Sequence, residues 1–207
     1  FFLQMQRKLQ VKLQLIVTDG IDLMCLSGHK FYGPKGVGAL YVRRKNPRVN
    51  LATIVHGGGH EKNLRAGTLN VPAIVGMGKA AEFAKTELWE TGAQISKQRT
   101  KLEQYLLDAG NVYINGSTKN RLPNTTNLLI TNVKADKLTA AVPLVSMAMG
   151  SACTSAAAEP SHVLKAMGLT DEEVFSSVRI SVGKYTTDEE IDFAIEKITA
   201  AIKLLRG

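Results

Sequence analysis

Cysteine, tryptophan and long apolar runs are all scarce in this sequence of 207 residues, and each scarcity excludes a class of protein. Two cysteines cannot form the disulfide framework of a small secreted domain. No run of about 18 apolar residues is present, so we expect no membrane-spanning helix and no membrane partner. The opening FFLQMQRKLQVKLQLIV is interrupted by too many Gln, Lys and Arg residues to be the apolar core of a signal peptide. We therefore expect a cytoplasmic protein, with an organelle matrix as the alternative.

Acidic residues are also few, because the sequence contains 18 Asp and Glu residues but 26 Lys and Arg residues. The net charge is therefore +8. A charge of this sign raises the question of nucleic-acid binding. The basic residues are, however, spread along the chain, and the main local cluster is Arg43, Arg44, Lys45 and Arg48. No helix-turn-helix or aromatic-rich RNA-binding pattern accompanies them. We do not expect nucleic acid to be a partner.

What the chain does contain is the composition of a globular protein, with 44% hydrophobic and 21% charged residues. A chain of this length can form one large domain or two small ones. Short apolar runs alternate with helical patterns, which indicates an α/β fold. The composition changes near residues 87–92, so we predict a boundary there, with a first domain at 1–86 and a second at 87–207.

The first domain shows two strand patterns followed by helical ones. IDLMCLS and VGALYVRR read as strands joined by the turn-forming YGPKG, and Cys25 in the first of them is expected to be a buried thiol. Asn70 and Pro72 mark the start of a helix, and a second helix is expected after Gly92. Small residues of the first helix are expected to pack closely against another element: Gly76, Gly78, Ala80 and Ala81.

The second domain mixes short strands with helices. Gly110 is the natural stop of the helix that follows Gly92, and NVYIN and NLLITNV read as strands. Near the C-terminus, Thr187 and Glu190 have the spacing of a capping box. One face of the helix that follows is apolar: Ile191, Ala194, Ile195, Ile198, Ile202 and Leu205.

Lys30 lies in the stretch SGHKFYGPKGVGALYVRR, between a histidine and two aromatic residues. A lysine that forms a covalent bond with a substrate or cofactor needs a depressed pKa, which burial and neighbouring positive charge supply. Ser27 and His29 add donors that suit an anion such as a phosphate. Taken alone, Lys30 is better interpreted as a surface lysine at the end of a strand, and the spacing by itself cannot overturn that interpretation.

This stretch resembles the cofactor-lysine segment of the cysteine desulfurases, pyridoxal-phosphate enzymes related to the class V aminotransferases. Further stretches agree in the same order: GGGHEKNLRAGTLN, RLPNTTN, and GSACTSAAAEPSHVLKAMG followed by VRISVGKYTTDEEID. The agreement extends from about Val17 to the C-terminus. The resemblance implies the fold of type I pyridoxal-phosphate-dependent transferases, with the C-terminal part of a large α/β domain followed by a small α/β domain.

The resemblance assigns a role to five residues around the cofactor, pyridoxal 5'-phosphate. Lys30 would form the covalent bond to it and carry a proton between substrate carbons. Ser27 and His29 would bind its phosphate. Thr68 matches a threonine that reaches the phosphate of the partner subunit, which implies a homodimer. Arg179 matches the arginine that holds the substrate carboxylate, although a structural ion pair is the alternative for this residue.

Cys153 matches the cysteine that takes sulfur from the substrate L-cysteine as a persulfide and leaves L-alanine. Such an attack needs an exposed, partly ionised thiol on a loop that can move, and the small residues of MGSACTSAAAEP suit that loop. A cysteine in a tight alanine-rich turn is the alternative. GSACTS also resembles the branch of the family that serves iron–sulfur cluster assembly, which implies an iron–sulfur scaffold protein as sulfur acceptor. No metal ligand set is expected.

The beginning of the chain departs from the family, which shows there a strand of the form DAxQxxGK. Its Asp pairs with the ring nitrogen of the cofactor and its Gln meets the ring hydroxyl. Residues 1–17 contain no Asp, and none of their Gln residues stands in this motif. Read in a neighbouring frame with permitted codons, Phe2 to Ile16 can encode TDATQA, a variable residue and GKI. We expect this segment to be an out-of-frame translation of the motif. His60 and Leu69 replace the usual Gln and Glu of the family.

Three functions remain open at this point. The first is a cysteine desulfurase. The second is a relative that acts on selenocysteine or another amino acid, but the cysteine of GSACTS favours sulfur transfer over this second function. The third is an inactive, truncated desulfurase that acts only as a binding or dimerisation module, an alternative favoured by the missing Asp.

Overall fold

The computed structural model describes residues 3–5, 20–149 and 159–207. The chain divides into two compact units, Phe1–Trp89 and Glu90–Gly207. The division falls within the stretch where the composition changes. Cys153 and, apart from residues 3–5, the segment proposed to be out of frame lie outside the described residues.

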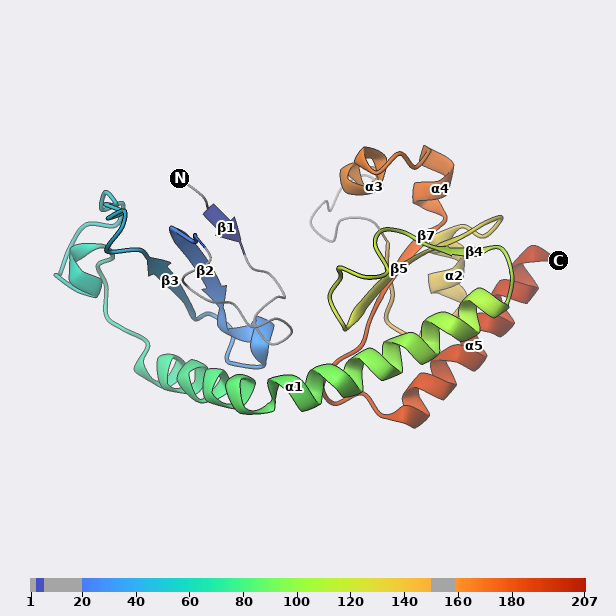
Figure 1. The fold of residues 1–207 in the computed structure, drawn as a ribbon, viewed down its shortest axis with the longest axis horizontal. Coiled ribbons are helices and arrows are strands. Elements are labelled where there is room, and N and C mark those ends of the chain that lie inside the picture. The colour runs from blue at the N-terminus through green and yellow to red at the C-terminus, as the bar shows by residue number, and fades with distance from the viewer. Residues whose placement is uncertain (1–2, 6–19, 150–158) are drawn as a thin grey trace. The chain divides into compact units, whose positions relative to one another are not determined.

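The first unit contains a three-stranded sheet in the order β1-β2-β3 (Figure 1). Strand β1 (Leu3–Met5) runs parallel to β2 (Leu23–Ser27), and β2 pairs antiparallel with β3 (Gly38–Val42). A single 3-10 turn, η1 (Gly28–Phe31), links β2 to β3. The two strands predicted around the YGPKG turn are therefore confirmed. The glycine-rich segment that follows is irregular except for the short turn η2 (Glu61–Asn63).

Cys25 is exposed, so the prediction of a buried thiol was wrong. Successive side chains of a strand point to opposite faces of the sheet. Met24, one residue earlier, is buried with 8% of its surface exposed, which places Cys25 on the other face of β2. An apolar run reads the same whether one or both faces of the strand are covered, and only the structure distinguishes the two cases.

Helix α1 (Val71–Asp108) is continuous, so the prediction of two helices separated at Gly92 was wrong. Asn70 starts the helix as predicted, because its side-chain oxygen accepts a hydrogen bond from the Ala73 N–H at 3.3 Å. A glycine inside a helix costs about 1 kcal/mol. Ile95, three residues after Gly92, is only 2% exposed, and burial of such a side chain stabilises by about 1.5–3 kcal/mol. Burial therefore outweighs the helix-breaking tendency of Gly92. Gly110 lies just beyond the end of α1 and adopts a left-handed φ of +77°, which confirms the prediction that it ends the helix.

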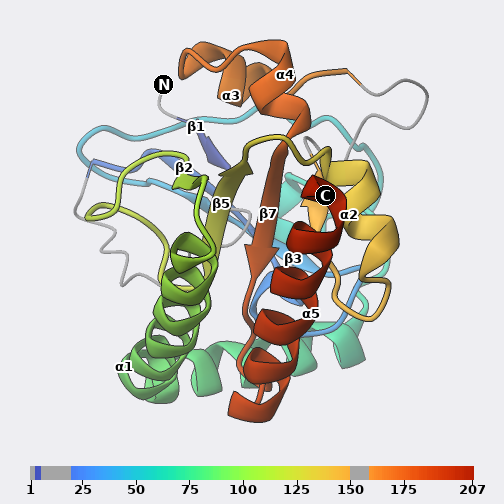
Figure 2. The same ribbon diagram turned by 90° about the vertical axis from the view of Figure 1, so that its right-hand side faces the viewer.

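The second unit contains a four-stranded antiparallel sheet in the order β4-β5-β7-β6. The strands are β4 (Val112–Ile114), β5 (Thr125–Ile130), β6 (Ala148–Met149) and β7 (Ser177–Ser181). The further helices are α2 (Ala135–Ala141), α3 (His162–Ala166), α4 (Asp171–Phe175) and α5 (Asp188–Arg206). Within this unit, α1 and α5 lie side by side over β5 and β7 (Figure 2).

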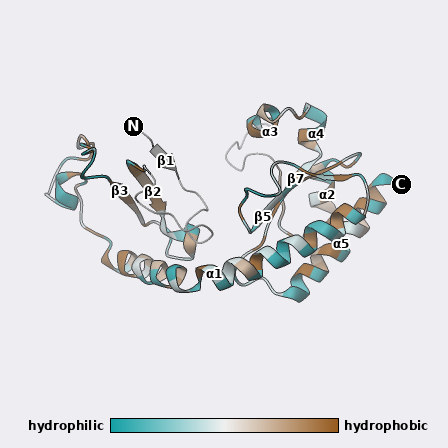
Figure 3. Ribbon diagram, in the orientation of Figure 1, coloured by the Kyte–Doolittle hydropathy of each residue, from teal (hydrophilic) through white to brown (hydrophobic). Residues whose placement is uncertain are grey.

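The core of the second unit lies between these helices and one face of the sheet. It is built from side chains that are almost completely buried: Leu102, Leu106, Leu128, Ile130, Leu138, Val178, Ile198 and Ile202. The predicted capping box of α5 is present, with both Thr187–Glu190 hydrogen bonds formed. All six residues of the predicted apolar face of α5 join the core, fully or in part. Figure 3 shows the corresponding apolar and polar bands along α5.

No helix in residues 3–5, 20–149 or 159–207 combines the length and the apolar character needed to cross a membrane.

Candidate functional site

The turn that carries Lys30 is closed onto strand β3 by backbone hydrogen bonds. The Gly28 N–H donates to the Val37 carbonyl at 2.9 Å, and the Gly33 N–H donates to the Gly28 carbonyl at 3.0 Å. Tyr32 ends the turn in the left-handed conformation, with φ of 67°, which is unusual for a residue with a side chain. Lys30 thus lies just after β2 in a tight turn that these backbone hydrogen bonds close.

Glycine is required at two positions of this turn because the backbone approaches too closely for a side chain. A Cβ at Gly38 would lie 2.5 Å from the Leu26 carbonyl oxygen, and one at Gly28 would lie 3.0 Å from the Pro34 carbonyl oxygen. These two glycines allow β2 and β3 to meet directly beside Lys30.

Small residues of α1 pack against the turn that carries Lys30. A Cβ at Gly76 would lie 2.8 Å from Pro34 Cγ, and one at Gly33 would lie 3.3 Å from the Ala80 Cβ. The prediction of close packing is confirmed for Gly76 and Ala80. It was wrong for Gly78, where an added Cβ would meet nothing within 4 Å.

The polar groups of the turn point to an anion. Ser27 Oγ lies 3.1 Å from His29 Nδ1, and His29 and Lys30 are exposed. When both ring nitrogens of His29 carry hydrogen, Nδ1 donates to the Ser27 oxygen, and the Ser27 hydroxyl and the other ring nitrogen both remain as donors for a ligand. The Lys30 amine has no hydrogen bond or ion pair with any described residue. The structure therefore places the predicted phosphate-binding residues Ser27 and His29 in contact, with Lys30 next along the chain.

These residues fit pyridoxal phosphate. The phosphate of that molecule needs several donors, which the Ser27 hydroxyl and the His29 ring can supply. Its aldehyde needs a primary amine without a competing partner, which Lys30 presents.

Thr68 lies in the exposed loop that follows η2. The loop is held by a hydrogen bond from the Ala66 N–H to the Val55 carbonyl at 3.2 Å, and Arg65 Nη1 donates to the Gly67 carbonyl at 3.2 Å. No described hydrogen bond joins Thr68 to Ser27, His29 or Lys30.

Arg179 belongs to the second unit and lies on β7. Its Nε is buried and has no hydrogen-bond partner among the residues that the structure describes. No ion pair to Arg179 occurs among the described residues, so the structural ion pair considered from the sequence is not seen there. An unpaired buried donor of this kind is available for an anionic ligand.

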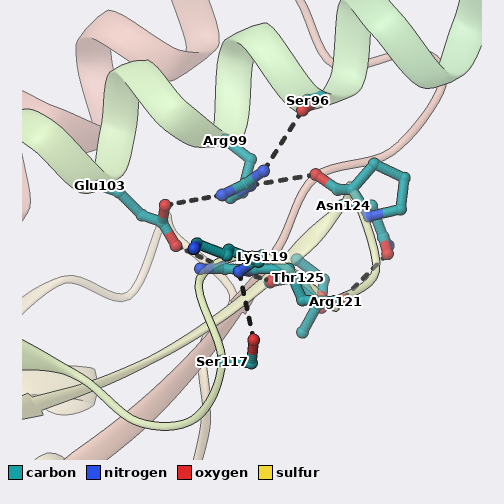
Figure 4. A network of polar contacts seen from close by, with 10 residues as sticks. Ser96, Arg99, Glu103, Ser117, Lys119, Arg121, Asn124 and Thr125 are labelled. Carbon is teal, nitrogen blue, oxygen red and sulfur yellow. Dashed lines mark hydrogen bonds and ion pairs between the residues drawn. The ribbon is translucent and has the colours of Figure 1, made fainter.

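The sequence analysis missed a buried charge network around Glu103, which is only 5% exposed (Figure 4). The Glu103 carboxylate forms ion pairs with Arg99, at 2.8 Å, and with Arg121. Arg121 also donates to the Thr125 carbonyl at 2.8 Å, and Arg99 donates to the Pro123 carbonyl at 3.1 Å. The network therefore ties the segment RLPNTTN to α1. The only signal in the sequence was the four-residue spacing of Arg99 and Glu103.

A cavity of about 800 Å³ also lies in the first unit, lined among others by Leu40, Arg44, Arg48 and Lys62. Lys30 does not line it. No group of three or more metal-ligating side chains occurs in the described part of the chain.

Comparison with known proteins places these features in a family. Residues 4–193 match the model of the family described as aminotransferase class-V. Cysteine desulfurase IscS from Mannheimia succiniciproducens is 50% identical over 186 residues, which are 90% of this chain and 46% of that protein. The chain thus spans about half the length of the curated relatives it matches.

Two solved structures extend the comparison. A NifS-like protein from Rickettsia africae has a TM-score of 0.86 at 31% identity, covering 98% of this chain and 53% of its own. A structure described as SspA in complex with cysteine has a TM-score of 0.68 at 35% identity, covering 90% and 51%. The fold class expected from the sequence is confirmed by these matches.

Proposed function

The chain belongs to the class-V aminotransferase family, and from this membership we propose that it acts in a pyridoxal-phosphate-dependent cysteine desulfurase. The enzyme would convert L-cysteine to L-alanine and pass the sulfur on as a persulfide of Cys153. The observation that carries the proposal is the turn in which Ser27 and His29 lie 3.1 Å apart, directly before an unpaired Lys30. The solved relative in complex with cysteine supports L-cysteine as the substrate.

Each of the candidate site residues has a defined task in this reaction. Ser27 and His29 would hold the phosphate of the cofactor, and Lys30 would hold the cofactor covalently and carry a proton at Nζ. Arg179 holds the substrate carboxylate through its buried Nε–H. Pyridoxal phosphate, when bound, supplies an electron sink for the bonds around the substrate α-carbon.

Cys153 would accept the sulfur atom. Its thiolate forms a bond to the substrate sulfur while the bond from that sulfur to the β-carbon breaks, and the carbon skeleton gains a proton and leaves as alanine. The atoms balance, because cysteine and a thiol become alanine and a persulfide. An iron–sulfur scaffold protein would then take the sulfur. We propose further that the enzyme is a homodimer in which Thr68 reaches the phosphate of the other subunit, with residues 1–86 in the cofactor domain and 87–207 in the small domain.

Addition of pyridoxal phosphate and L-cysteine to the chain tests the proposal. The absorbance band of the bound cofactor should appear, and sulfide should be released in the presence of a thiol reductant. Lys30→Ala should abolish the band, whereas Lys35→Ala, a lysine of the same turn, should leave it unchanged. Cys153→Ser should abolish sulfide release but keep the band, and Cys25→Ser should keep both. A chain that binds cofactor but releases no sulfide would instead favour the inactive binding module.

A further inference from the structure

A row of side chains crosses the sheet of the second unit on the face opposite the core. The Asn115 N–H donates to the Asn127 carbonyl at 2.9 Å, and Asn127 pairs with Arg179, which pairs in turn with Ala148. The four residues therefore follow one another across β4, β5, β7 and β6. Their neighbours along the strands, among them Leu128 and Val178, belong to the core. Because side chains alternate along a strand, the row points away from the core.

Asn127 and Arg179 face each other at close range. In an antiparallel pair of strands, residues that exchange backbone hydrogen bonds alternate with residues that do not, and the side chains of the latter lie closer together. The Val182 N–H donates to the Asn124 carbonyl and the Ile130 N–H to the Ser176 carbonyl, each at 2.9 Å. Hydrogen-bonded and non-hydrogen-bonded pairs alternate between these two bonds. The pair of Asn127 and Arg179 lies three residues from each of them and therefore exchanges no backbone hydrogen bonds.

A chain of hydrogen bonds fixes which end of the Asn127 side chain is free. Ser177 Oγ donates to the Glu173 backbone carbonyl at 2.7 Å, and a carbonyl can only accept. The Ser177 oxygen must therefore accept from Asn115 Nδ2, at 3.0 Å. Asn115 Nδ2 also donates to Asn127 Oδ1 at 2.7 Å. With its oxygen engaged there, Asn127 is left with Nδ2, a donor, as its free end.

Two residues that pair across β5 and β7 thus each carry a donor for which no described acceptor is recorded. Asn127 Nδ2 has no hydrogen-bond partner among the described residues, and neither has the buried Nε of Arg179. Ala148, on the other side of Arg179, offers only a methyl group. A buried donor without a partner is unfavourable, so Arg179 Nε favours an acceptor that the described residues do not supply.

We infer that Asn127 is a second binding residue for the substrate carboxylate, with Asn127 Nδ2 and Arg179 Nε donating to the two oxygens of one carboxylate group. The inference rests on the proposed function, because it takes the carboxylate to be that of the amino-acid substrate. It makes the site selective for amino acids with a free carboxylate over their amides, since two adjacent donors need two adjacent acceptors.

L-Alanine, the unreactive product, is the probe for a test by NMR on the ¹⁵N-labelled chain of 207 residues. The Arg179 Nε–H signal and the Asn127 side-chain NH₂ signals should both shift with saturation, and L-alaninamide should shift neither. Asn127→Ala should weaken alanine binding about tenfold, as expected for one hydrogen bond to a charged group. Asn127→Asp keeps the shape but places a carboxylate beside Arg179, so the alanine-dependent shift of Arg179 should disappear.

Thr125→Ala is the matched control. It alters the next pair on the same face of β5 and β7, where the Thr125 and Ser181 hydroxyls lie 3.3 Å apart, and it should leave alanine binding unchanged. The signals of the unsubstituted chain keep the test decisive even if a variant fails to fold. An Asn127 signal that stays in place while Arg179 shifts, an unchanged affinity in Asn127→Ala, or no shift of Arg179 at all would each overturn the inference. Sulfide release and the Lys30-dependent absorbance band report on the proposed function separately, since neither readout depends on the Asn127 signal.

Discussion

The hydroxyl oxygen of Ser27, the last residue of β2, lies 3.1 Å from Nδ1 of His29, the residue that precedes Lys30. This contact orients the imidazole relative to the end of the strand. A ring nitrogen and a hydroxyl are then held together directly before a lysine, and these groups suit an aldehyde that carries a phosphate.

His29→Ala removes one donor to that phosphate. Because a hydrogen bond to a charged group is lost, we expect the dissociation constant of pyridoxal phosphate to rise at least about tenfold. Titration of the absorbance band measures it. His56→Ala is the control, since His56 is equally exposed but lies outside the turn, and it should bind as before. Equal affinities of the two variants would remove His29 from the site.

Gly38→Ala should destabilise the lysine-bearing turn, because the new Cβ would lie 2.5 Å from the Leu26 carbonyl oxygen. A backbone shift of this kind costs about 1–3 kcal/mol. Gly78→Ala is the matched control within the same unit, because its Cβ meets nothing within 4 Å and alanine favours the helix by about 0.5–1 kcal/mol. Urea unfolding should show opposite signs for the two variants. A stable Gly38→Ala chain would mean that β2 and β3 can separate at no cost.

Glu103→Ala should lower the free energy of unfolding by about 3–5 kcal/mol, because it leaves Arg99 and Arg121 buried without their counter-charge. Lys79→Ala breaks the exposed pair with Glu82, whose side chains are 55% and 62% exposed, and should cost less than about 1 kcal/mol. Denaturant unfolding of both variants provides the comparison. If Glu103→Ala cost no more than Lys79→Ala, the network would not be what holds the RLPNTTN segment to α1.

Glu173 should make stability depend on pH at the N-terminus of α4. The pKa of Glu173 lies below its ordinary value, first because the Thr170 backbone N–H donates to the carboxylate and second because the Thr170 hydroxyl does. A folded pKa below the unfolded value of about 4.3 stabilises the protein above that pH and loses the contribution as the pH falls through the folded pKa.

The stability difference between the unsubstituted chain and Glu173→Gln, measured by unfolding at several pH values, should therefore be constant near neutrality and shrink below about pH 4. Thr170→Ala keeps the backbone donor, which is the larger cause, so most of the pH dependence should remain. A difference that did not change with pH would contradict the assignment.

The parts of the fold that sequence patterns predicted correctly are governed by neighbours along the chain. The two strands around YGPKG, the Asn70 start of α1, the Gly110 stop and the Thr187–Glu190 capping box each depend on a few adjacent residues. The two main errors have one cause. Whether Gly92 breaks a helix, and whether Cys25 is buried, depends on what packs against that position, and packing partners come from distant parts of the chain.

The amino-acid sequence by itself determined the local turn around Lys30, because glycines, a serine and a histidine within a dozen residues specify its backbone path and its donors. Only the tertiary structure decided the Glu103 network and the row from Asn115 to Arg179. Residues 115, 127, 177 and 179 meet through strand register, and register is set by which faces of β4, β5 and β7 the core buries. Residue 173 joins them from α4. The direction of each hydrogen bond in that row follows from a backbone carbonyl of α4, so the free donor of Asn127 is a property of the assembled sheet and of no single segment.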